Sequence, residues 1–130
     1  MNNNISLGFI FLAFISLLAS VLLGCLAALQ YVSDTPLEGV LSFQLMRPLH
    51  VSMVIAWIFS SALAGIYYYL PKIVKQPMYS IKLVRIHFIV FIVTGLVILY
   101  SYFTKSFGGR EYWAFPPYLS IPILISWLFL

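Results

Sequence analysis

Charged side chains are scarce in this sequence. They make up 8% of its 130 residues, against roughly a quarter in an ordinary soluble domain, while 63% of the residues are hydrophobic. This composition argues strongly against a soluble protein. The seven basic residues sit near the ends of apolar runs and in connections rather than on one clustered surface, so nucleic acid is not an expected partner.

Cysteine and basic N-terminal residues are also nearly absent. The single Cys25 lies inside an apolar run and can form no internal disulfide, and the sequence that attaches c-type haem is missing. The first four residues carry no positive side chain, and the apolar run that follows exceeds the roughly 7 to 15 residues of a signal-peptide core. We interpret this run as a retained span, with a cleaved signal as the alternative.

Long apolar runs are what the sequence has in abundance. A membrane-crossing helix needs about 20 mostly apolar residues, and the runs here are continuous rather than alternating, which favours helices over strands. The sequence therefore predicts an all-α, polytopic transmembrane helical bundle, with residues 1–130 as a single region. Full spans are expected at about 6–29, 45–70 and 83–103, with Pro48 in the first turn of the second span and Pro71 closing it.

A fourth apolar run, at about 118–130, is too short to cross a membrane. Because a chain ending there would leave its terminal carboxylate in or near hydrocarbon, we expect the N-terminal part of a larger protein. The connection between the second and third spans is basic and has no acidic residue, and basic short loops stay in the cytoplasm. The N-terminus and this connection are therefore expected to be cytoplasmic, with the 30–44 and 104–117 connections outside.

Two histidines are the ionisable residues expected at membrane depth. His50 lies about one turn inside the outer end of the second span, where a neutral imidazole could ligate haem iron and Arg47 could meet a haem propionate. The alternative is a hydrogen-bonded histidine at a helix contact, with Arg47 as an interfacial anchor. His87, near the cytoplasmic end of the third span, is interpreted as an interfacial histidine that reaches toward water.

Two further features have both a structural and a functional interpretation. A stretch of small residues at 60–65 makes the second span narrow on one side, where a flat macrocycle or another helix could approach. Glu111 follows two glycines and Arg110 in an outer loop, where its carboxylate could ligate a hard cation such as calcium or pair with Arg110. The residues alone favour the pairing.

Three segments together resemble a known family: QLMRPLHVS at 44–52, GIYYYLP at 65–71 and GREY at 109–112. They are similar to the start of the catalytic subunit of the haem-copper oxidase superfamily, in its nitric oxide reductase branch. The resemblance runs from the first span into the fourth. The Arg-Pro-Leu-His segment is shared with the C-family cytochrome c oxidases, whereas the Gly-Arg-Glu-Tyr loop favours nitric oxide reductase.

This resemblance implies roles for three residues. His50 matches one of two axial ligands of a low-spin haem b, Arg47 matches an arginine near the haem propionates, and Glu111 matches a glutamate that helps to hold calcium. The family often has a second glutamate three residues after this one, and here that position is Ala114. The other low-spin ligand, the high-spin haem ligand and the non-haem iron or copper ligands come from later helices, so no catalytic residue is expected within 1–130.

The implied function is electron entry into a respiratory oxidoreductase of the inner membrane that reduces NO to nitrous oxide. The short 30–44 connection lacks the long hydrophilic insertion of quinol-using forms, which implies a cytochrome c-type electron-donor subunit. The expected surroundings are the remaining helices of the same subunit and the lipid bilayer. Two alternatives stay open: a C-family oxidase reducing dioxygen, and a non-catalytic accessory subunit in which His50 is structural.

Overall fold

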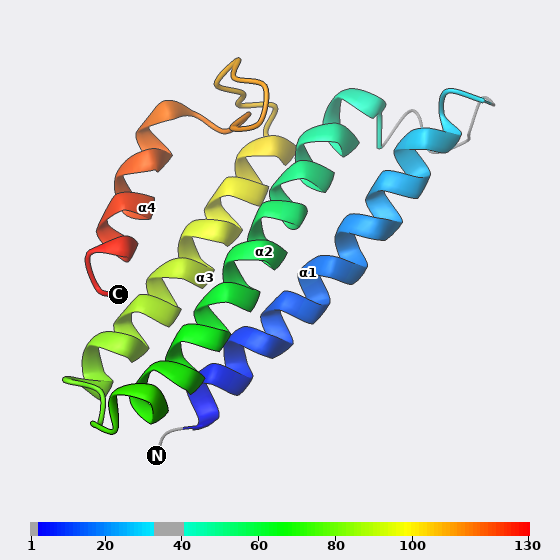
Figure 1. Ribbon diagram of the computed structural model, residues 1–130. Helices are drawn as coiled ribbons and strands as arrows, with labels where there is room; N and C mark the ends of the chain where they lie inside the picture. Colours follow the sequence, from blue (N-terminus) through cyan, green and yellow to red (C-terminus); the bar gives the residue numbers. More distant parts are fainter. Residues whose placement is uncertain (1–2, 33–40) are drawn as a thin grey trace.

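Four helices make up most of the described chain. The computed structural model describes residues 3–32 and 41–130 (Figure 1). In chain order the elements are α1 (Asn3–Leu29), α2 (Phe43–Val74), α3 (Ile81–Phe103), a short 3₁₀ turn η1 (Pro117–Leu119) and α4 (Ser120–Trp127). The first three helices are long and apolar enough to cross a membrane, whereas α4 is shorter. The predicted all-α transmembrane bundle is confirmed.

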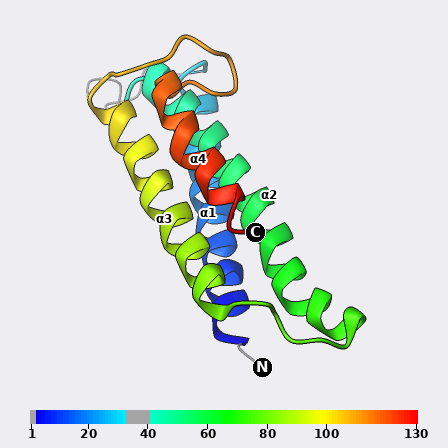
Figure 2. The ribbon, with the colours of Figure 1, turned by 90° about the vertical axis from the view of Figure 1, so that its left-hand side faces the viewer.

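The long helices lie side by side and alternate in direction (Figure 1). The start of α2 and the segment 104–116 lie at one end of the bundle, which we call the His50 end, and the α2–α3 connection lies at the other. Helix α4 turns back over α2 and α3 on the side away from α1 (Figure 2), and its Trp127 ring packs edge-on against Phe59 with centroids 5.3 Å apart. The topology therefore brings the His50 and Glu111 segments to the same end.

Both prolines of α2 lie inside the helix, and this corrects two predictions. The helix begins at Phe43, so Pro48 falls beyond the first turn, and it continues through Pro71 to Val74. Each proline removes one backbone hydrogen bond without forcing the chain out of the helix, and at Pro71 this loss falls in the last turn. Lys75, in the left-handed conformation at φ 55°, is the residue that ends the helix.

Near the N-terminus of α1, helices α1 and α2 are held together by small residues, a hydrogen bond and an apolar cluster. The Ser6 hydroxyl donates to the backbone carbonyl of Ala64 at 2.9 Å, inside the interface. Lipid gives no hydrophobic driving force for association, so close packing and such hydrogen bonds determine how transmembrane helices pair. The neighbouring cluster of buried residues joins α1, α2 and α3: Phe9, Leu63, Ala64, Tyr67 and Val84.

At the His50 end, α2 is attached to α3 and to the segment that follows it. The hydroxyls of Ser52 and Tyr102 are hydrogen-bonded at 2.8 Å. Around them lies a second buried cluster: Leu49, Tyr102, Ala114, Phe115 and Leu119. Leu49 and Ser52 therefore fix the backbone of α2 next to His50 against α3 and the segment that follows it, independently of the contacts that His50 makes.

Candidate functional site

The side chain of His50 extends from α2 to α1. Its Nδ1 atom lies 2.6 Å from the backbone carbonyl oxygen of Ser20. A carbonyl oxygen can only accept, so Nδ1 of the neutral ring carries the proton and Nε2 keeps its lone pair. The ring is half-buried, and Nε2 makes no hydrogen bond to any residue in the ranges 3–32 and 41–130.

This arrangement fits an axial haem ligand. Metal-binding histidines usually donate their second ring N–H to a carbonyl or carboxylate, which selects the tautomer and orients the ring. His50 already has such a partner in Ser20, and its other nitrogen is the one suited to iron. A histidine at a helix contact would form the same bond to Ser20.

A glycine on α1 makes room for the His50 ring. A Cβ atom placed on Gly24 would lie 2.9 Å from both Cε1 and Nδ1 of the imidazole, closer than ordinary contact allows. Gly24 and Ser20 are four residues apart and share one face of α1. Neither residue was predicted from the sequence, although small residues recur at this spacing at Ser16, Ser20 and Gly24.

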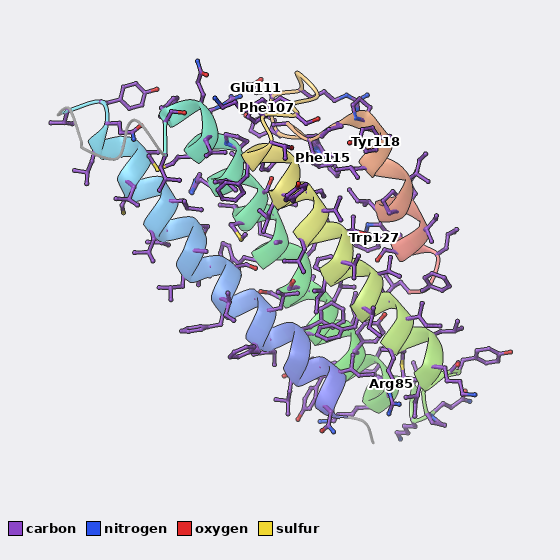
Figure 3. All side chains as sticks on the ribbon, turned by 180° about the vertical axis from the view of Figure 1, so that it is seen from behind. Arg85, Phe107, Glu111, Phe115, Tyr118 and Trp127 are labelled. Carbon is purple, nitrogen blue, oxygen red and sulfur yellow. The ribbon has the colours of Figure 1, made fainter. Side chains whose placement is uncertain are left out.

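Arg47 and Glu111 are both exposed at the His50 end. In the described part of the chain, neither side chain has an oppositely charged nitrogen or oxygen atom within 4.0 Å. The pairing of Glu111 with Arg110 is therefore not observed. Figure 3 shows Glu111 at the opposite end of the molecule from Arg85. Arg47 and Glu111 are thus available to groups outside the described residues.

The loop that carries Glu111 is closed by a backbone hydrogen bond. The Gly108 N–H donates to the carbonyl of Ala114 at 2.7 Å, and Gly109 has a φ of +73°, which glycine adopts without strain. The Ala114 side chain, at the position where the family often has a second glutamate, is only 7% exposed within the apolar cluster near Leu49. Glu111 is the one acidic residue in the described ranges, which contain no group of three potential metal-ligating side chains.

The interpretation of His87 as an interfacial histidine is wrong. Its side chain is 0% exposed, and its Nδ1 atom is hydrogen-bonded to the hydroxyl of Tyr67 on α2. Phe9 and Trp127, from α1 and α4, also pack near the ring. Nε2 of His87 has no partner among the described residues. The imidazole faces the neighbouring helices instead of the membrane surface, because three of them cover it.

The small-residue side of α2 borders a groove that is separate from His50. The groove has a volume of about 580 Å³ and lies between α1 and α2, where its lining includes Ser61, Ala64 and Gly65. These residues begin eleven positions after His50, roughly 16 Å farther along the helix at 1.5 Å per residue. The expected narrow side is present, but it does not form a slot beside the imidazole.

These helices define a multi-pass helical membrane protein, and comparison with known proteins identifies its family. The sequence profile described as Cytochrome C and Quinol oxidase polypeptide I matches residues 4–130, so the chain belongs to this family of haem-copper oxidoreductases. The resemblance identified from residues 44–52, 65–71 and 109–112 is confirmed.

One curated relative points to a branch within the family. The chain is 32% identical over 90 residues to a subunit of the nitric oxide reductase of Stutzerimonas stutzeri. The match covers 69% of this chain and 19% of that protein, so the chain spans about a fifth of its relative's length. No solved structure matches the chain significantly.

Proposed function

We propose that this chain is the N-terminal part of the catalytic subunit of a respiratory nitric oxide reductase, and that His50 is one of two axial ligands of its low-spin haem b. The observation that carries the proposal is the family match over residues 4–130, together with the similarity to the Stutzerimonas stutzeri nitric oxide reductase. The bond from Nδ1 of His50 to the Ser20 carbonyl is compatible with this role, because it leaves Nε2 as the nitrogen that could bind a metal.

The residues of this chain would serve electron entry. A bound haem b supplies reversible one-electron transfer. His50 would hold its iron, the Ser20 carbonyl would orient the imidazole, and the Arg47 guanidinium would neutralise a propionate. No residue of the chain is proposed as catalytic. The second axial ligand, the high-spin haem ligand and the non-haem iron or copper ligands would come from the remaining helices of the subunit.

The distribution of charge supports an orientation in the inner membrane with the N-terminus in the cytoplasm. Four basic side chains surround the α2–α3 connection and all are exposed: Lys72, Lys75, Lys82 and Arg85. Basic residues in short loops remain on the cytoplasmic side. The His50 end then faces outward, where a cytochrome c-type electron-donor subunit would deliver electrons.

The substrate is tested by supplying the purified full-length subunit, loaded with haem, with an electron donor and either NO or dioxygen. A nitric oxide reductase couples two NO molecules to nitrous oxide and water, and we expect nitrous oxide together with non-haem iron. Reduction of dioxygen with bound copper would instead assign the chain to a C-family cytochrome c oxidase, with which it shares the Arg-Pro-Leu-His segment. A purified protein that takes up no haem and shows neither activity would favour an accessory subunit.

Glu111 is proposed as a ligand of a calcium ion near the haem propionates. Its exposed carboxylate can supply one of the six to eight oxygen ligands that calcium takes. We expect Glu111→Gln to lower the calcium content of the purified protein and to increase haem loss on chelation, as measured by metal analysis and haem absorbance. Tyr112→Phe, one residue away and also exposed, should leave both unchanged. Wild-type calcium in Glu111→Gln would remove this residue from the site.

A further inference from the structure

We infer that Gly24 is a positioning residue for the axial haem ligand: together with the backbone carbonyl of Ser20, it sets the rotation of the His50 ring. This inference rests on the proposed role of His50. It assigns to α1, which supplies no side chain to the metal, control over the geometry and electron-donating strength of the ligand.

A single turn of α1 provides both the Ser20 carbonyl and the space at Gly24. In an α-helix the Ser20 carbonyl accepts the N–H of Gly24, and its second lone pair remains for another donor. Nδ1 of His50 uses that lone pair at 2.6 Å. Reaching it requires the ring to lie directly against residue 24, where only the absence of a side chain leaves space. The hydrogen bond to Ser20 therefore depends on residue 24 being a glycine.

The backbone of α2 is not free to relieve a clash at this position. Next to His50, Leu49 belongs to the buried cluster shared with α3, and the Ser52 hydroxyl is bonded to Tyr102. Toward the other end of the same α1–α2 interface, the Ser6 bond to Ala64 holds the two helices in register. A methyl group at residue 24, 2.9 Å from two ring atoms, would consequently rotate the imidazole and lengthen its bond to Ser20.

Rotation of the ring has a spectroscopic consequence distinct from a general loss of stability. The orientation of an axial imidazole plane influences the g values of a low-spin ferric haem, and the hydrogen bond to Nδ1 makes the ligand more basic. A weaker bond therefore favours the ferrous state and raises the midpoint potential. The loss of an outer partner of this kind typically lowers affinity for the metal group by roughly 10- to 100-fold.

The test compares three alanine variants of the haem-loaded protein by electron paramagnetic resonance, redox titration and haem content. Gly24→Ala is expected to shift the low-spin g values, raise the midpoint potential and reduce haem retention. Gly8→Ala is the matched control on the same helix, because its Cβ would lie 2.9 Å from Phe88 Cζ instead of from His50. Gly65→Ala, with nothing within 4 Å of its Cβ, controls for the change in helix propensity.

Ser20→Ala tests whether the His50 ring depends on the backbone carbonyl of Ser20 or on its side chain. The Ser20 hydroxyl bonds within α1 to the Leu17 carbonyl, so its removal leaves the acceptor of His50 in place, and wild-type g values are expected. Gly24→Ala with wild-type g values, potential and haem content would overturn the inference. The proposed function fails by a different result, namely a low-spin haem that survives loss of the His50 imidazole.

A measurement on the unaltered protein tests the inference even if the Gly24→Ala variant does not fold. Nitrogen NMR of isotope-labelled histidine in the reduced, low-spin protein reports which ring nitrogen of His50 is protonated. We expect a hydrogen-bonded proton on Nδ1. A ring with its proton absent from Nδ1, or with Nδ1 exposed to water, would show that the contact with Ser20 and Gly24 is not formed and would refute the inference.

Discussion

Replacement of His50 by alanine is expected to abolish the low-spin haem absorption band while leaving the protein inserted in the membrane. The substitution removes Nε2, the nitrogen proposed to bind iron, and thereby one of the two axial ligands. The apolar helices and the contacts of Leu49 and Ser52 remain, so the bundle keeps its main supports. Reduced-minus-oxidised spectra and haem content per purified protein measure the effect.

His87 provides the matched control for this experiment. It is the other histidine of the chain, lies in a spanning helix and is fully buried, but its ring is bonded to Tyr67 and enclosed by aromatic side chains. We expect His87→Phe to retain the low-spin band. Retention of the band in His50→Ala, or its loss only in the His87 variant, would show that His50 is not the ligand.

Gly108→Ala is expected to destabilise the Glu111 loop more than any other glycine substitution in the described chain. Its Cβ would overlap the backbone carbonyl of Phe115, which cannot rotate away as a side chain can. Relief of that overlap requires the Gly108 bond to Ala114 to break. Overpacking and the lost hydrogen bond together should lower the free energy of unfolding by roughly 2 to 4 kcal/mol.

Thermal unfolding in detergent, followed by circular dichroism and haem release, tests this expectation. Gly95→Ala, inside α3 with nothing within 4 Å of the added Cβ, should be neutral or stabilise the helix by up to about 1 kcal/mol. If Gly108→Ala and Gly95→Ala have the same midpoint, the closed form of the loop is not important for stability.

The three long apolar helices could be predicted because a run of about 20 apolar residues favours a helix that can cross a bilayer. The ends of the helices could not be predicted as closely, since helix termination depends on local backbone energetics that proline does not decide by itself. Pro71 illustrates this: the helix accepts one lost hydrogen bond and ends only where Lys75 adopts a left-handed conformation. Composition alone could not distinguish these two stopping points.

For the site, the sequence showed which ionisable residues were unusual but not what surrounds them. His50 and Arg47 were identified because ionisable side chains within or beside apolar runs cost free energy in a membrane unless they are paired or bind a ligand. Gly24 and the Ser20 carbonyl were missed, since their role depends on the register between α1 and α2. His87 was misplaced for the same reason: its position near a helix end suggested water, whereas its direction within the bundle determines its burial.

The bond between Tyr67 and His87 bears on the biogenesis of the protein. An α3 segment entering the bilayer alone would expose an imidazole to lipid, whereas α2 carries the hydroxyl that bonds to its Nδ1 atom. The two helices are joined by a short connection of six residues, 75–80, so the Tyr67 hydroxyl is already close along the chain when α3 enters the bilayer. Pairing of α2 with α3 thus gives the His87 imidazole a hydrogen-bond partner in Tyr67 that lipid could not supply.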